Sequence, residues 1–278
     1  MDGVLALTRD AALVAWAVRV RGNRQQAERV RERSERPDFY APVASAFKAD
    51  PNRTDEAALD YLRALVQPGE TWLDIGAGGG RYALPLARIA GEVIAVDPSE
   101  GMLSVLREGM AEHHIANVRI INSRWPMGPP PPADVAFIAH VGYDIEDIGP
   151  FLDAMEASAK RLCVAVLLAE SPAMVAAPFW PAIHGEDRVP LPALPEFLAL
   201  QLARGRLCSV WLSERAPARY HDREMALRGL RQQLFIEPGG AKDALLMELA
   251  EDYLGSVHEG FAVARDPIPL GVVTWTPD

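Results

Sequence analysis

The chain has 278 residues, 49% of them hydrophobic and 24% charged, which is typical of a soluble globular protein with an ample core. Its formal net charge of −10 argues against a protein that binds nucleic acid by general electrostatic attraction. The two cysteines, Cys163 and Cys208, lie in apolar runs without metal-ligand spacing. We therefore expect reduced core cysteines and no metal site.

The N-terminal residues 3–33 predict a helix with an apolar face, ended by Pro37. Its second half, 19–36, holds seven arginines and three glutamates. A nucleic-acid-binding arm is one interpretation, but the acidic remainder of the chain favours a solvated helix face. Because Arg9 and Asp10 interrupt the apolar stretch, it predicts neither a signal peptide nor a membrane span, and we expect a cytoplasmic protein.

The next predicted helix covers residues 57–65, and Thr54 or Asp55 can cap it. Residues 71–81 then read Thr-Trp-Leu-Asp-Ile-Gly-Ala-Gly-Gly-Gly-Arg, a short strand that ends at a glycine cluster before a helix. A strand, a tight turn and a helix form the ligand-binding corner of a doubly wound sheet.

The spacing of the glycines discriminates between ligands. Arg81 stands where a dinucleotide fingerprint has its third glycine, and Asp74 would repel a pyrophosphate. These two residues disfavour an NAD(P)-dependent oxidoreductase. A glycine-rich turn without any ligand remains an alternative.

The pattern Asp74-x-Gly76-x-Gly78-x-Gly80 resembles motif I of the class I S-adenosylmethionine-dependent methyltransferases. The resemblance implies an α/β fold of three layers: a Rossmann-like, doubly wound sheet of seven strands, the last antiparallel, with N-terminal helices and helical insertions. It also implies S-adenosyl-L-methionine as cofactor. Gly76, Ala77 and Gly78 would lie against its amino-acid part, and Asp74 near its ammonium group.

The predicted strand 92–97 ends in Asp97, where an acid is placed to accept hydrogen bonds from both ribose hydroxyls of a nucleoside. Pro98 and Ser99 can start the following helix. The resemblance implies that Asp97 holds the ribose, with Pro98 beside it and Met102 packed on the adenine. A strand-end aspartate without a ligand is the alternative.

After the predicted strand 118–122, the family often has an acid that binds the adenine amino group, but this chain has Ser123-Arg-Trp-Pro. Three candidates remain for the adenine contact: Ser123, the backbone of Arg124, or a stacked Trp125. A plain turn with a packed Trp125 fits the sequence equally well.

The predicted strand 133–139 ends where the resemblance places the transferred methyl group, next to Ala139. His140 is the side chain there that can take a proton near neutral pH. Tyr143 and Asp144 could orient it or the substrate, so His140 and Tyr143 are the catalytic candidates. Alternatively, His140 caps a helix that begins near Ile145.

The resemblance further implies N-terminal helices that fold over the donor. Tyr40 and Arg53 are then candidate lid contacts, with Arg53 binding the donor's carboxylate. Core packing of Tyr40 and a surface position of Arg53 are the alternatives.

The rest of the chain predicts helices and strands without a further motif. We expect helices at 148–159, 197–202, 223–234 and 241–254, and strands at 161–169, 206–212 and 270–276. The proline-rich stretch 171–195 is expected to be irregular and to cover the substrate. The sequence thus predicts one domain, 1–278, made of a cap (1–66), a cofactor-binding core (67–170), a substrate-side cover (171–205) and last strands (206–278) with a helical insertion (216–267).

The class of molecule that accepts the methyl group can be narrowed only by motifs that the sequence lacks. Residues 139–142 lack the proline pair that follows strand four in enzymes methylating exocyclic amino groups of nucleobases, and Glu170 alone is too little for a divalent metal. We therefore predict methyl transfer to the O or N of a small molecule, without nucleic-acid or membrane partners. A non-catalytic S-adenosylmethionine-binding scaffold and an NAD(P)-dependent oxidoreductase are the alternatives.

Overall fold

The computed structural model describes residues 8–32, 38–257, 260–264 and 266–277. Its main sheet has seven strands in the order β3-β2-β1-β4-β5-β10-β6. The strands are β1 Thr71–Ile75, β2 Glu92–Asp97, β3 Val118–Asn122, β4 Ala133–Ala139, β5 Ala159–Leu168, β6 Ser209–Arg215 and β10 Ile268–Trp275. The last strand, β10, runs antiparallel between β5 and β6, and the others are parallel. The predicted fold class is confirmed.

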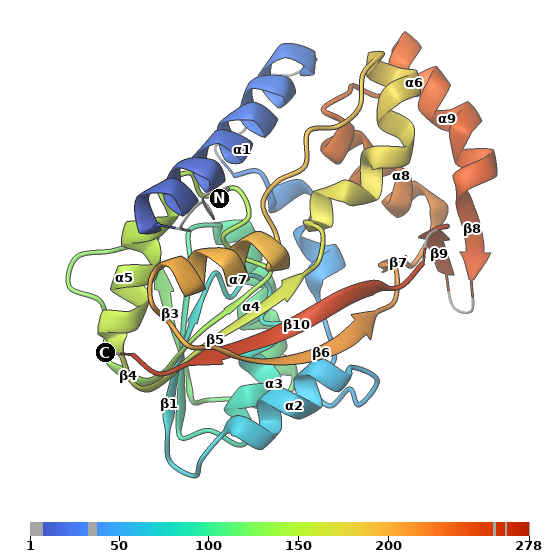
Figure 1. Cartoon of the computed structure of the whole chain (residues 1–278). Helices are drawn as coiled ribbons and strands as arrows, with labels where there is room; N and C mark the ends of the chain where they lie inside the picture. The colour runs from blue at the N-terminus through green and yellow to red at the C-terminus, as the bar shows by residue number, and fades with distance from the viewer. Residues whose placement is uncertain (1–7, 33–37, 258–259, 265, 278) are drawn as a thin grey trace, which may run out of the picture.

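Helices cover both faces of this sheet (Figure 1). One face carries α1 Arg9–Val30, α5 Ile148–Ser158 and α7 Leu194–Ala203, and the other carries α2 Ala57–Leu65, α3 Ala83–Ala87 and α4 Glu100–Glu112. Successive residues of a strand point to opposite faces, so Leu73 joins the first core and Trp72 the second. Residues 3–7, 33 and Pro37, predicted to lie in and after the first helix, are outside the described residues.

The arginines of α1 form ion pairs with carboxylates of other elements. Arg19 pairs with Glu196 at 2.7 Å, and Arg24 pairs with Glu146 at 3.0 Å. These pairs support the solvated-face interpretation of the arginine-rich stretch. Within the described ranges, no helix is long and apolar enough to cross a bilayer. Cys163 is buried, Cys208 is half-buried, and both are free thiols.

A second, smaller unit lies beside the main sheet, at the upper right of Figure 1. It contains a three-stranded antiparallel sheet, β7-β9-β8, and two helices close to their predicted bounds. Its elements are η2 Pro172–Phe179, α6 Trp180–His184, β7 Arg219–Tyr220, α8 Arg223–Leu234, α9 Ala241–Tyr253, β8 Leu254–Val257 and β9 Gly260–Val263. The three strands were not predicted, because two to four residues are too short for a periodic signal.

The prediction of an irregular stretch at 171–195 is wrong. Residues 172–184 form a 3-10 helix and a short α-helix, and α7 begins one residue before Pro195. Phe179 and Trp180 are buried in the core of the smaller unit, together with side chains of α8 and α9. Apolar side chains of this stretch therefore pack into a core of their own, which local sequence could not indicate.

Candidate active site

The glycine turn after β1 has a backbone that residues with a side chain rarely adopt. Gly76, Gly78 and Gly80 all have positive φ, at 77°, 54° and 86°. A Cβ on Gly76 would lie 2.5 Å from Cγ2 of Val141. The N–H of Gly76 donates to the carbonyl of Val96 at 2.7 Å and ties the turn to β2. The turn therefore presents bare backbone at the carboxyl ends of the strands.

Asp97 lies directly against this turn. Its Oδ2 accepts from the N–H of Gly78 at 2.9 Å, and its Oδ1 accepts from the N–H of Ser99 at 2.8 Å. Ser99 in turn caps α4, because its hydroxyl accepts from the N–H of Met102 at 3.1 Å. This confirms the predicted start of the helix just after Pro98. Burial raises the pKa of Asp97, although both backbone hydrogen bonds oppose the shift.

Asp74 is a buried acid near the end of β1. It is 2% exposed, and no hydrogen bond to its carboxyl is found among the described residues. Burial, and secondly the charge of Asp97, raise the pKa of Asp74 to about 8. A carboxyl in such a place favours a cation beside it, since a positive charge would offset the loss of hydration. The ammonium group of S-adenosylmethionine fits this requirement.

The segment before α2 covers the same edge of the sheet. In the 3-10 helix Ala41–Phe47 (η1), Ala44 packs on Met102 and Val105 of α4. Asp38 accepts from the hydroxyl of Ser99 at 2.8 Å. Burial opposes ionisation of Asp38, but the hydrogen bonds from Ser99 and three backbone N–H groups lower its pKa. Asp38 was missed in the sequence, because no motif links it to Ser99.

Tyr40 is 44% exposed on this covering segment. Desolvation of its phenol, and then the charges of Asp144 and Asp97, raise the pKa of Tyr40 to about 12. The lid contact of Tyr40 stays a prediction.

Arg53 belongs to a buried ionic cluster centred on Glu56. The Glu56 carboxylate accepts from Nε of Arg53 at 3.1 Å, from Nη2 of Arg81 at 2.6 Å, and from the hydroxyl of Tyr82. Burial would raise the pKa of Glu56, but its cationic and hydrogen-bonding neighbours lower it. Arg53 therefore already has a carboxylate partner, and its Nη2 also lies 3.1 Å from Oε2 of Glu56, although the angle of this contact is not that of a hydrogen bond.

The predicted cap of α2 is wrong. Glu56 occupies the N-cap position, in place of Thr54 or Asp55, and its side chain makes no capping hydrogen bond. That side chain is engaged by the ionic cluster instead. Tertiary contacts thus override the local preference for a capping threonine or aspartate.

His140 follows β4 in a left-handed conformation, with φ of 57°, which is uncommon for a residue with a side chain. Its Nε2 lies 2.7 Å from Nη1 of Arg215. Because a guanidinium can only donate, Nε2 is the acceptor and the proton of the neutral ring is on Nδ1. Burial, and then the charges of Arg215 and Arg81, keep the pKa of His140 well below its usual value. The ring is therefore neutral near pH 7.

The helix-cap alternative for His140 is wrong, because α5 begins only at Ile148, after Asp147. Tyr143 is 5% exposed, and its hydroxyl accepts from the N–H of Leu168 at 2.8 Å. Burial raises the pKa of Tyr143. Tyr143 thus fastens the turn after β4 to the end of β5, which is a positioning role.

On the predicted adenine side, Met102 is buried, and its Sδ lies 4.0 Å from the position of a Cβ on Gly78. The Ser123 hydroxyl donates to the carbonyl of Arg124 at 3.1 Å. Nε1 of Trp125 donates to the carbonyl of Phe151 on α5 at 3.2 Å. Trp125 is therefore packed against that helix, as the alternative of a plain turn predicted.

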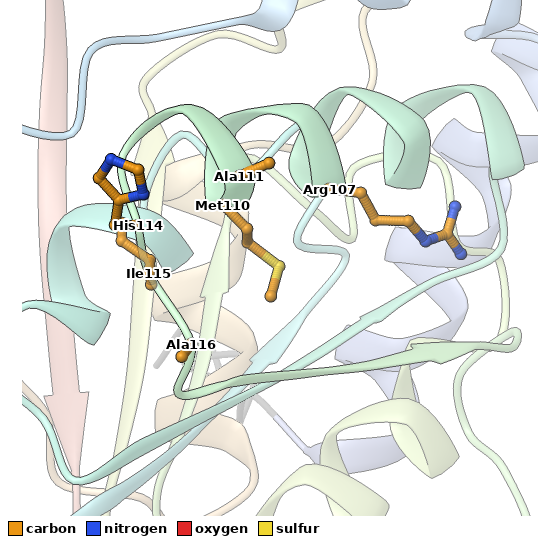
Figure 2. Close-up of a pocket in the computed structure, with 6 residues that line it drawn as sticks. All are labelled: Arg107, Met110, Ala111, His114, Ile115 and Ala116. Atoms are coloured by element: carbon orange, nitrogen blue, oxygen red, sulfur yellow. The ribbon is translucent and has the colours of Figure 1, made fainter.

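Two surface hollows lie at opposite ends of the strands of the main sheet. A depression of about 490 Å³ lies at the C-terminal end of α4. Figure 2 shows the residues that line it, Arg107, Met110, Ala111, His114, Ile115 and Ala116. The depression lies at the amino ends of the strands, away from Asp97. A second hollow, of about 190 Å³, is lined by Ala169 and Glu170 just after β5, together with Arg19 and Glu196. This smaller hollow is at the carboxyl ends, where ligands bind in such sheets.

Comparison with known proteins gives a family for the cofactor-binding part. Residues 73–161 match the family described as "Methyltransferase domain". A 23S rRNA (uracil(1939)-C(5))-methyltransferase of Shewanella sp. (strain MR-4) is 43% identical over 61 residues. That match covers 22% of this chain and 13% of the relative, so the chain spans only a small part of the length of such relatives.

Solved structures are similar in fold. The YcgJ protein of Bacillus subtilis has a TM-score of 0.56 at 16% identity, covering 80% of this chain and 98% of that one. A SAM-dependent methyltransferase of Geobacter sulfurreducens, in complex with S-adenosyl-L-homocysteine, has a TM-score of 0.55 at 16% identity, covering 88% and 99%. The chain thus contains, at residues 73–161, a segment that matches a methyltransferase family, within a fold similar to that of a solved SAM-dependent methyltransferase.

Proposed function

We propose that this protein transfers a methyl group from S-adenosyl-L-methionine to an oxygen or nitrogen of a small molecule. The observation that carries the proposal is the pairing of Asp97 with the Gly78 N–H, next to the buried Asp74, whose carboxyl has no hydrogen-bond partner among the described residues. One acid suits the hydroxyls of a nucleoside and the other suits a cation. A nucleoside that bears an ammonium and a sulfonium matches both.

Each residue of the predicted donor site has a part in this proposal. Asp97 holds the ribose, Asp74 faces the ammonium, and the glycine turn lies against the amino-acid part. Arg53 reaches the donor's carboxylate while its Nη2 stays ion-paired with Glu56 at 3.1 Å. The adenine is bordered by Pro98, Met102, Ser123, Arg124 and Trp125, and Ala139 borders the methyl group.

When bound, S-adenosylmethionine supplies the activated methyl group, which leaves alignment and the exclusion of water to the protein. Alignment alone can contribute about 7–11 kcal/mol of barrier reduction, so a dedicated base is not obligatory. The neutral ring of His140 is nevertheless the group able to accept a proton at the end of β4. Tyr143 holds the turn that carries it.

A small acceptor is supported by the surface near the site. The hollow after β5 has about 190 Å³, a volume too small for a polynucleotide. The arginines of α1 are engaged with Glu196, Glu146 and Glu186. The net charge of −10 opposes a phosphate backbone.

The test has a binding part and a turnover part. Titration calorimetry with S-adenosylmethionine and S-adenosylhomocysteine should show binding to the wild type and to Asp252→Asn, an exposed control on α9. Asp97→Ala should bind more weakly. A methyl-release assay over small acceptors and an RNA pool then measures turnover. Binding of the donor without methylation of any acceptor would support a non-catalytic scaffold. Methylation of RNA alone would refute the small-molecule acceptor. Affinity for NAD(P) alone would refute the assignment as a methyltransferase.

A further inference from the structure

Arg215 reaches far across the edge of the main sheet. It is the last residue of β6, and two strands, β10 and β5, separate β6 from β4 in the sheet order. Its Nη1 nevertheless lies 2.7 Å from Nε2 of His140, just after β4. The guanidinium therefore spans the carboxyl end of β5 and the amino end of the antiparallel β10, on the side where an acceptor would approach the transferred methyl group.

Three arginines surround one carboxylate beside His140. Arg53, Arg81 and Arg215 gather around a single carboxylate, that of Glu56, whose pKa all three arginines lower. Arg53 and Arg81 are ion-paired with Glu56. Among the residues that the structure describes, no carboxylate lies within ion-pair distance of Arg215. Its side chain is half-buried, so its charge is neither neutralised nor fully hydrated.

Two buried donors beside Arg215 also lack an acceptor. Nε of Arg81 and Nδ1 of His140 have no hydrogen-bond partner in the described part of the chain. Nδ1 carries the proton of the ring, because Nε2 accepts from Arg215. Arg81, His140 and Arg215 therefore offer donors that need hydrogen-bond acceptors. An oxyanion supplies both the acceptors and a negative charge.

We propose that Arg215 binds an oxyanion of the acceptor, a carboxylate or a phosphate, and so selects acidic small molecules as substrates. The proposal rests on the proposed methyl transfer and names its substrate class. A guanidinium can donate two parallel hydrogen bonds to such a group, which fixes orientation as well as position. Arg215 is thereby a specificity-determining residue.

Binding of an oxyanion to Arg215 would also change the hydrogen bonding of His140. An oxyanion that takes over the Arg215 guanidinium removes the hydrogen bond now made to Nε2. The freed lone pair can then accept the proton of the acceptor's O–H or N–H, which leaves Nε2–H on the ring and an unprotonated nucleophile. An anionic substrate would thus free the ring nitrogen of His140 that takes its proton.

The turnover test compares acids with matched neutral molecules. Small acids that carry an O–H or N–H nucleophile are assayed beside their carboxamides, using wild type, Arg215→Gln, Arg215→Lys and Arg219→Gln. Arg219 is an exposed arginine on β7 and serves as the charge control. We expect the wild-type kcat/KM to be about tenfold or more higher for the acids than for their carboxamides. This ratio corresponds to the loss of one hydrogen bond to a charged group. Arg215→Gln should abolish this preference through KM, Arg215→Lys should restore part of it, and Arg219→Gln should keep it.

A binding test does not depend on finding the acceptor. Protein saturated with S-adenosylhomocysteine is titrated with benzoate, phenyl phosphate or benzamide at constant ionic strength, while the imidazole ¹⁵N resonances of His140 are followed. The two anions should shift the Nε2 resonance toward its position in Arg215→Gln, and benzamide should not. An equal response to benzamide, or an acid preference that survives Arg215→Gln, overturns the proposal. Loss of S-adenosylhomocysteine binding would instead refute the proposed function, so the two failures are distinguishable.

Discussion

The carboxylate of Asp97 accepts a hydrogen bond from the backbone N–H of Gly78, 2.9 Å away. Nineteen residues separate them in the chain, and the parallel pairing of β1 with β2 brings their two strand ends together. Each carboxylate oxygen has further lone pairs, so this bond leaves capacity for the hydroxyls of a ribose. The bond joins the two motifs on which the predicted donor site depends.

The first prediction concerns Asp97. Asp97→Ala should weaken the binding of S-adenosylhomocysteine by about 1.5–3 kcal/mol, because hydrogen bonds to a charged group are lost. Titration calorimetry measures this loss, and Asp252→Asn should bind like the wild type. An unchanged affinity of Asp97→Ala would remove the ribose contact.

The second prediction is a pH dependence of donor binding, caused by Asp74. The pKa of Asp74 is about 8 in the free protein, and a bound cation favours the ionised carboxylate and so lowers this pKa. Between the two pKa values binding releases a proton, so affinity should rise with pH, by up to about tenfold per unit. The measurement is best kept below about pH 7.5, where the donor's amino group is still protonated.

Asp74→Asn is the matched variant for this effect. It should bind the donor more weakly near neutral pH and lose the rise of affinity with pH. Calorimetry in two buffers of different ionisation enthalpy should show proton release on binding for the wild type alone. Proton release that persists in Asp74→Asn would assign the effect to another group.

The third prediction concerns His140, which is neutral at pH 7 because burial and Arg215 keep its pKa well below 6.5. His140→Ala should leave donor affinity unchanged and lower kcat about 100-fold or more, the range of general base catalysis. The wild-type kcat should show no inflection near pH 6.5, because the ring is already unprotonated there. A kcat unaffected by His140→Ala would leave alignment as the source of catalysis.

The fourth prediction concerns stability. Glu56→Gln removes the charge that holds Arg53, Arg81 and Tyr82, so it should lower the free energy of unfolding by about 1–3 kcal/mol. Glu224→Gln removes the carboxylate of an exposed ion pair with Arg231 and should cost less than about 1 kcal/mol. Chemical unfolding of both variants checks the difference, and equal losses would show that burial adds nothing to the Glu56 cluster.

The sequence by itself determined the cofactor half of this protein. The stretch from Asp74 to Gly80 and the strand-end Asp97 are local patterns, because strand, turn and helix are each specified by neighbouring residues. Parallel pairing then forces the ends of β1 and β2 to one edge. The seven-stranded sheet with its antiparallel last strand was implied by the same resemblance and is confirmed.

Only the tertiary structure decided the acceptor side. The Arg215 guanidinium meets His140 across 75 positions of sequence, and Arg81 meets Glu56 across 25. Such contacts depend on the direction of long side chains after the strands have assembled, and no periodicity or local spacing encodes them. For the same reason the sequence could not show that Phe179 and Trp180 pack with α8 and α9 in a core of their own.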